Sequence, residues 1–466
     1  MARLFPFRAL RYDPTRVNMA DVVTQPYDKI DKQMQERYYN LSPYNLVRVV
    51  LGKHYPDDND QHNVYTRAAE TLKKWRGEHI LHEESAPALY GYSQTYTVPG
   101  TGGATGTKAE IRERRGFIAL GQLHDYADKI VYRHEQTFPK HKSDRLALFK
   151  ATRAYCEQIY MLYSDPTFTA EKVIFEAPPA TADSGASVRP DARKPDLEIV
   201  DEYHVVHRVW KVTDAQLIHR VLDAMKDKWL LIADGHHRYE TSVGYMHERA
   251  EQMHCDAKAD PKLTPDGLPQ PAFPEQAMMM TFVNMDAPGI TILPTHRVVS
   301  GLANFNLREF AEKAKQYFDV QELESSLTPA QLLAKLNATD GVAFVAAARD
   351  GNLLLKPKPD AVAPLLKGLS PRQQQLDVTQ LHKVILEKMF GLDEETIRKG
   401  EVIRYYREAD ESVERVKSGK ADVAFLIKPV TLEQMKDISL NLEVMPQKST
   451  DFYPKLLSGL AMYTLD

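Results

Sequence analysis

Residues 229–241 read WLLIADGHHRYET and show most clearly which elements this chain forms. Its first five residues are apolar and predict a buried strand, which the turn-forming pair Asp234-Gly235 brings to an end. Apolar residues then recur three and four positions apart, as the buried face of a helix requires: Tyr239, Val243 and Met246. A strand that leads through a tight turn into a helix is typical of proteins that combine both element types.

The rest of the chain alternates between helical and strand patterns in the same way. Residues 143–163 begin as an amphipathic helix and run into a buried segment, and residues 213–227 repeat the helical spacing. The short apolar runs at 342–346 and 423–427 predict buried strands. We therefore expect an α/β fold of mixed α+β type.

The composition excludes several classes of protein. The chain has 466 residues, and its 60 Lys and Arg against 64 Asp and Glu leave a net charge of -4, which argues against nucleic-acid binding. Cys156 and Cys255 are too few for a disulfide framework or a four-thiolate zinc site. No stretch approaches the roughly 20 apolar residues of a membrane span, and no signal-peptide pattern is present. These features predict a cytoplasmic protein that does not bind membranes.

Three stretches have linker composition, at residues 98–106, 177–195 and 256–276. The first is expected to form the tip of a hairpin between residues 90–97 and 111–120. We expect three consecutive regions: an N-terminal α/β domain with this hairpin (1–125), a phosphate-binding region (126–300) and a C-terminal α/β domain whose tail returns to the site (301–466).

The helix predicted after Gly235 begins with residues suited to an anion. Free backbone N–H groups and the helix dipole favour negative charge at such an end. His236, His237 and Arg238 add cationic or potentially cationic side chains, so a phosphate group fits there. Asp234 would cap the helix or hold Mg²⁺ beside the phosphates. The alternatives are an ordinary capped helix start and, less favoured because adjacent histidines diverge on a helix, a zinc site.

A second charged cluster covers residues 132–145. Glu135 is a candidate general base for a substrate hydroxyl. The other candidates are cationic or potentially cationic side chains that would neutralise a phosphate or contact the substrate: Arg133, His134, Lys140 and Lys142. The alternative is a solvated loop that Ser143 caps before the following helix.

Three further motifs are candidates for the same cleft. Residues 445–459 combine lysines, hydroxyls and aromatics, and the candidates for phosphate contact are Lys448, Ser449 and Thr450. Turn-forming stretches near the N-terminus and after residue 293 supply candidate substrate contacts: Tyr27, Asp28, His296 and Arg297. The alternatives are a docked C-terminus and ordinary turns. Walker, GxSxG, kinase and EF-hand motifs are absent from the sequence.

Taken in chain order, these motifs resemble those of the DUF1015 family of bacterial and archaeal proteins. The resemblance spans nearly the whole chain and rests on residues 25–28, 133–135, 144–146, 233–240, 293–297 and 445–459. It implies a common fold without naming an activity.

A partial resemblance is more informative about chemistry. Residues 234–238 are similar to the phosphate-binding signature of the ParB/sulfiredoxin-like fold, and His134-Glu135 is similar to a pair in its free-serine kinases. The resemblance implies that Glu135 deprotonates a substrate hydroxyl, that Asp234 organises Mg²⁺, and that His237 and Arg238 bind the transferred phosphate. It also implies an insertion between Glu135 and Asp234. His236 in place of a cysteine disfavours a sulfiredoxin activity.

The function that these observations favour is a small-metabolite phosphotransferase. ATP, ADP or pyrophosphate would be the donor, and a hydroxyl compound such as serine the acceptor. One alternative is a nucleotide-binding regulator that contacts DNA or a protein partner, and another is a phosphate-ester hydrolase. The expected partner is a small-molecule substrate, and the residues point to no particular oligomeric state.

Overall fold

The computed structural model describes residues 2–101, 108–137, 139–176 and 194–466. The predicted hairpin tip at 102–106 and most of the predicted linker at 177–195 lie outside these residues. The chain forms two compact units. The first contains Met1–Arg133, Thr137–Ile290 and Pro454–Asp466, and the second contains His134–Gln136 and Thr291–Tyr453. Both units combine helices with a sheet, so the predicted mixed α/β class is confirmed.

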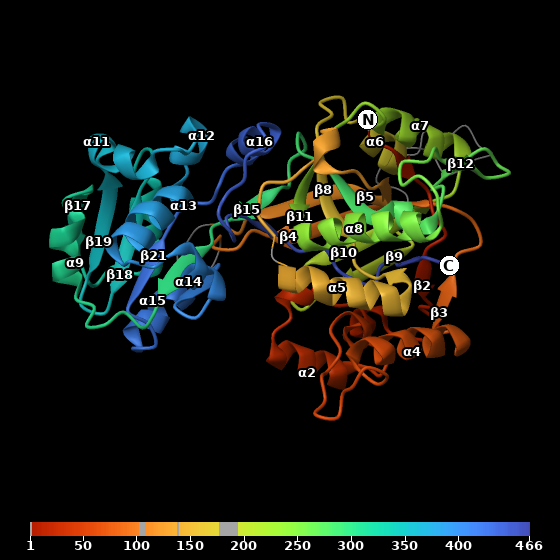
Figure 1. Ribbon diagram of the computed structural model, residues 1–466, viewed down its shortest axis with the longest axis horizontal. Helices are drawn as coiled ribbons and strands as arrows, with labels where there is room; N and C mark the ends of the chain where they lie inside the picture. Colours follow the sequence, from red (N-terminus) through yellow and green to blue (C-terminus); the bar gives the residue numbers. More distant parts are fainter. Residues whose placement is uncertain (1, 102–107, 138, 177–193) are drawn as a thin grey trace. The chain divides into compact units, whose positions relative to one another are not determined.

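The first unit is built on a mixed nine-stranded sheet (Figure 1). Its strands lie in the order β6 (Val131–Tyr132), β11 (Leu230–Asp234), β8 (Ile159–Tyr163), β14 (Ala277–Asn284), β5 (Ile111–Gln122), β4 (Leu89–Thr97), β10 (Val206–Val212) and β9 (Leu197–Val200), with β1 (Leu4–Phe5) paired to β5. The β14–β8 and β11–β6 pairs are parallel, and the others are antiparallel. All five residues of β8 and all eight of β14 are buried, which explains why their sequences read as continuous apolar runs.

Helices α5 (Pro139–Thr152) and α8 (His236–Gln252) pack against each other in the first unit (Figure 1). Tyr239 and Met246 of α8 enter the same core cluster as β8 and β14. The other long helices of this unit are α2 (Lys32–Leu41), α4 (Val64–Gly77) and α7 (Ala215–Met225). In the part of the chain that the structure describes, no helix has both the length and the apolarity to cross a membrane.

The helix predicted to begin at residue 143 ends earlier than its pattern suggests. Helix α5 stops at Thr152, and Arg153 has a positive φ of 49°. Strands β7 (Ala154–Tyr155) and β8 follow, because residues 159–163 form a fully buried run that the sheet takes up as a strand.

The second unit has an antiparallel six-stranded sheet of its own. The strands lie in the order β17 (Phe318–Leu323), β19 (Asn352–Pro357), β18 (Phe344–Ala348), β21 (Val423–Leu426), β16 (His296–Val299) and β20 (Ile403–Tyr406). Helices α10 (Pro329–Asn337) and α15 (Ala409–Lys417) contribute buried residues to its core. A short helix, α13 (Asp377–Gln380), continues into the π-helix η7 (Leu381–Met389). Strand β15 (Thr291–Leu293) pairs with β22 (Asp451–Tyr453).

Candidate functional site

The turn between β11 and α8 brings Arg238 back over the backbone of Gly235. Gly235 has a φ of 96°, and a Cβ atom there would lie 2.9 Å from Nη2 of Arg238. Both facts favour glycine, since a side chain would be strained and would collide with the guanidinium. The N-cap residue of α8 is Gly235, which has no side chain that could cap the helix. His236 is buried in the first turn, and His237 is partly buried beside it.

Asp234, at the end of β11, lies between two cations. Nζ of Lys455 donates to its Oδ1 at 2.8 Å, and Nη2 of Arg238 donates to its Oδ2 at 3.3 Å. Burial alone would raise the pKa of Asp234, but Lys455 and Arg238 outweigh it and hold the pKa well below its usual range. Asp234 is therefore a carboxylate at every physiological pH.

Arg238 is itself buried between two carboxylates. Its Nη1 lies 3.2 Å from Oε1 of Glu157, and its side chain is 4% exposed. Burial alone would lower the pKa of Arg238, but Glu157 and Asp234 raise it. Its Nε has no hydrogen-bond partner among the described residues. The two carboxylates thus hold the guanidinium in place, and its Nε–H remains as a donor without an acceptor among the described residues.

The network continues from Glu157 toward the N-terminal motif. The backbone N–H of Tyr27 donates to Oε1 of Glu157 at 2.9 Å, and Nη1 of Arg145 lies 3.5 Å from its Oε2. Tyr27 belongs to the 3₁₀ helix η1 (Tyr27–Lys29), and Arg145 lies 3.9 Å above its ring centroid. Arg145 also pairs with Asp144 at 2.6 Å. Glu157 thus joins Tyr27, 130 positions before it, and Arg238, 81 positions after it, within the first unit.

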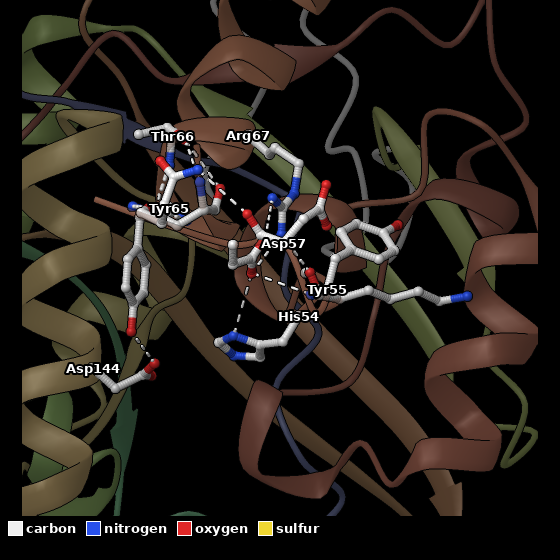
Figure 2. Close-up of polar contacts among 12 residues, drawn as sticks. His54, Tyr55, Asp57, Tyr65, Thr66, Arg67 and Asp144 are labelled. Atoms are coloured by element: carbon white, nitrogen blue, oxygen red, sulfur yellow. Dashed lines mark hydrogen bonds and ion pairs between the residues drawn. The ribbon is translucent and has the colours of Figure 1, made fainter. Parts of the chain in front are cut away.

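Helix α4 anchors the far end of this network. The hydroxyl of Tyr65 donates to Oδ1 of Asp144 at 2.8 Å, and Figure 2 shows the phenol pointing toward that carboxylate. Arg67 of the same helix donates from Nη1 to Oδ1 of Asp58 at 2.6 Å. From Lys455 to Asp144 the network alternates between cations and anions, and the Tyr65 hydroxyl ends it, so each buried charge has an opposite neighbour.

The cations of the second sequence cluster meet at Glu240 of α8. Arg133 lies 3.1 Å and Lys142 2.6 Å from its carboxylate oxygens, and Thr137 also donates to it. Burial would raise the pKa of Glu240, but Lys142 and Thr137 outweigh it, so the pKa is lowered. Lys140 belongs to α5, and its side chain lies outside the described residues. Asp28 is exposed in η1 and close enough to Arg238 to raise the pKa of that side chain.

The other predicted residues gather within the second unit. Nε2 of His134 lies 2.8 Å from Oγ1 of Thr450, and the backbone N–H of Lys448 donates to Oε1 of Glu135 at 2.8 Å. Ser449 is buried and donates to the carbonyl of Pro446. The loop at residues 446–450 therefore orients the carboxylate of Glu135 through the backbone N–H of Lys448.

Strand β16 holds the last two predicted residues, and both are fully buried. The backbone N–H of Ile427 donates to Nδ1 of His296 at 3.3 Å. Burial and the charge of Arg297 lower the pKa of His296 to about 3. Nη2 of Arg297 donates to the carbonyl of Lys448 at 3.1 Å. Arg297 is thus linked through this loop to Glu135.

Sequence reasoning missed three residues that the first network depends on, namely Glu157, Lys455 and Tyr65. Glu157 carried a signal, because it stands between the buried segments at 154–156 and 159–163, where a charge requires partners. Lys455 lies inside the quoted C-terminal motif without being singled out there. Tyr65 lies in an ordinary amphipathic helix, and nothing in its neighbourhood distinguishes it.

Comparison with solved structures finds distant likenesses. One is a free serine kinase in complex with AMP, with 12% identity, coverage of 70% of this chain and 84% of that chain, and a TM-score of 0.32. Another is a conserved hypothetical protein from Pyrococcus furiosus, with 12% identity, coverage of 70% of this chain and 89% of that chain, and a TM-score of 0.33. A third is SbnI with a C-terminal truncation, from Staphylococcus aureus, with 10% identity, coverage of 73% of this chain and 85% of that chain, and a TM-score of 0.34.

Comparison of the sequence with protein-family models assigns the chain to a family. No curated protein matches the chain. The family model described as "Protein of unknown function (DUF1015)" matches residues 4–379, which is most of the chain and includes the motifs at Tyr27, Glu135 and Asp234. The resemblance expected from those motifs is confirmed: the chain belongs to the DUF1015 family.

Proposed function

We propose that the protein is a small-metabolite phosphotransferase whose donor, a nucleotide or pyrophosphate, binds at the start of α8. The observation that carries this proposal is the pairing of Lys455 and Arg238 on Asp234, beside a helix start without a side-chain cap. Free N–H groups of the first helical turn attract phosphate oxygens, and buried cations strengthen the attraction.

Mg²⁺ fits this arrangement as an ion shared with the donor. It is commonly held by one or two carboxylates together with substrate phosphates and water, and Asp234 supplies one ionised carboxylate. Both oxygens of Asp234 already accept from Lys455 and Arg238, so a dedicated all-protein site is not supported. When bound, the ion would neutralise charge on the phosphates.

Residues of the chain would supply the general base and the contacts to the transferred phosphate. Glu135 is the proposed base: its carboxylate takes the proton of the acceptor hydroxyl as the acceptor oxygen bonds to phosphorus and the bond to the donor oxygen breaks. His237 and Arg238 would bind the transferred phosphate. Phosphoryl transfer depends mainly on positioning and charge, and hydrogen bonds hold the side chains of Glu135 and Arg238 in place.

The other proposed contacts divide between the two units. In the first, Lys142 and Arg133 are held at Glu240 as a cationic pair that would contact the substrate or donor, with Tyr27, Asp28 and Lys140. In the second, the proposed contacts come from β16, from residue 134 and from the loop that orients Glu135: His134, His296, Arg297, Lys448, Ser449 and Thr450.

Phosphorus NMR of the full chain with Mg²⁺, each donor and a panel of hydroxyl metabolites tests the proposal. A new phosphate-ester signal that depends on the acceptor supports the phosphotransferase. Release of inorganic phosphate without an acceptor would favour the hydrolase instead. Nucleotide binding without any turnover would favour the regulator.

A further inference from the structure

Several buried polar atoms of the second unit have no hydrogen-bond partner among its described residues. Among its described residues they lie on two short segments, residues 295–297 and 377–382. The atoms are Oγ1 of Thr295, Nε2 of His296, Nε of Arg297, Oδ2 of Asp377, Oγ1 of Thr379, Oε1 of Gln380 and Nε2 of His382. Buried polar groups are nearly always hydrogen-bonded, so these atoms call for a bound polar species or water. Of the residues that carry them, His296 and His382 lie close enough to Arg297 for its charge to lower the pKa of both.

Arg297 is a buried cation without an ion-pair partner among the described residues. Its side chain is 0% exposed, and its Nη atoms donate only to backbone carbonyls, those of Thr295, Gln447 and Lys448. Carbonyl oxygens carry only partial charge. Glu135 and Tyr405 act on the guanidinium electrostatically, but among the described residues neither forms an ion pair with it. Burial lowers the pKa of Arg297 to about 10, so it is still a cation at neutral pH. An unpaired buried charge is costly, and an anion would remove that cost.

The imidazole of His296 presents a second donor. Because the N–H of Ile427 donates to its Nδ1, that nitrogen carries no proton, and the neutral ring carries its proton on Nε2. This Nε2–H is buried and has no acceptor among the described residues.

His382 supplies a third group from the neighbouring π-helix η7. It is buried, and Arg297 lies close enough to contribute, after burial, to lowering its pKa well below the usual value. Its Nε2 also has no partner among the described residues. Irregular π-helical turns often occur where a helix is shaped around a ligand.

We propose that Arg297, His296 and His382 form an anion-binding site within the second unit, which takes a small carboxylate or phosphate group. Such a group offers several acceptor oxygens to the Nε of Arg297, to the Nε2–H of His296 and to His382 in the tautomer that protonates its Nε2, and it supplies a full counter-charge. Its residues belong to the second unit, whereas Asp234, Arg238 and Lys455 of the proposed donor site belong to the first. Because His296 and Arg297 are also proposed substrate contacts, the anion site gives those two contacts a ligand class.

The test titrates the full chain with inorganic phosphate and with acetate, at constant ionic strength maintained with chloride, and follows the melting temperature. The two probes distinguish a phosphate from a carboxylate ligand. Binding to the folded state raises the melting temperature with probe concentration. We expect one of the probes to do so, and we expect His382→Leu to weaken its apparent affinity at least tenfold, as the loss of a hydrogen bond to a charged group implies.

Two further variants separate the possible outcomes. Arg238→Ala changes the proposed donor site in the first unit. It should leave anion binding at Arg297, His296 and His382 in place even where it abolishes nucleotide binding. The anion site is therefore tested independently of the donor site. Arg297→Met should abolish the effect of the probe if the variant folds, and His382→Leu carries the test if it does not. The site is refuted if neither probe raises the melting temperature, or if His382→Leu titrates like the parent, which would leave ordered water as the partner of these atoms.

Discussion

Nζ of Lys455 lies 2.8 Å from Oδ1 of Asp234, although 221 positions separate the two residues in the sequence. The contact ties the C-terminal segment of the first unit to the turn before α8. It also decides the ionisation of Asp234, because the ammonium group, together with Arg238, outweighs the effect of burial on its pKa. The anionic centre of the proposed donor site therefore depends on a lysine near the end of the chain.

Replacing this lysine should destabilise the first unit. Lys455→Met removes one partner of a buried pair, and such a loss costs about 3 kcal/mol at pH 7. The pKa of Asp234 is lowered on folding, so this stability is present above the usual carboxyl pKa of 3.8 and is lost as the pH falls toward the folded-state value. Urea unfolding of parent and variant should thus differ most at pH 7 and less at pH 3.

Asp234→Asn provides the control for that comparison. Because the two residues share one interaction, Lys455→Met and Asp234→Asn together should cost less than the sum of the single changes. Equal unfolding midpoints for the parent and Lys455→Met at pH 7 would show that the contact does not stabilise the protein.

Gly235 and Gly244 of the same strand-turn-helix segment should respond oppositely to alanine. Gly235→Ala places a Cβ against Arg238 in a left-handed backbone conformation, which should cost about 1–2 kcal/mol and weaken nucleotide binding. Gly244 is exposed within α8 with open space around it, so Gly244→Ala should stabilise by up to about 1 kcal/mol. Thermal unfolding measures both changes. Similar effects at both positions would contradict the geometry of the turn.

The second unit should lose stability in mildly acidic solution. The pKa of His296 is about 3 in the folded chain, against 6.5 for an ordinary histidine, so between these values the unfolded chain binds a proton that the folded chain does not. Stability therefore falls by about 1.4 kcal/mol per pH unit across this window. His296→Asn keeps an acceptor for the N–H of Ile427 and should flatten the slope. An unchanged slope would exclude His296 as its cause.

Glu135 should be required for turnover and dispensable for donor binding. Glu135→Gln keeps an acceptor for the N–H of Lys448 but cannot take a proton, so the rate should fall at least 100-fold while nucleotide affinity stays within about twofold. Coupled kinetics and calorimetry of the same preparation give the two values. Turnover at the parental rate would remove Glu135 from the role of base.

The sequence predicted the strand-turn-helix unit at 229–241 because its pattern is local. Apolar residues, an Asp-Gly turn and helical spacing follow one another directly along the chain, and β11, Gly235 and α8 form there in that order. The partners of Asp234 and Arg238 could not be predicted in this way. Glu157 and Lys455 reach them only because the sheet places β8 beside β11 and the last segment returns to the first unit.

Isothermal titration calorimetry of the full chain with Mg²⁺ and ATP, ADP or pyrophosphate measures whether a phosphate donor binds at the start of α8. The parent and Arg220→Ala, which removes an exposed arginine from α7, should bind one of these donors equally well. Arg238→Ala should bind it at least tenfold more weakly, because a charged hydrogen bond to phosphate is lost. Equal affinity of Arg238→Ala and the parent, or no binding of any donor to the parent, would contradict a phosphate site at the start of α8.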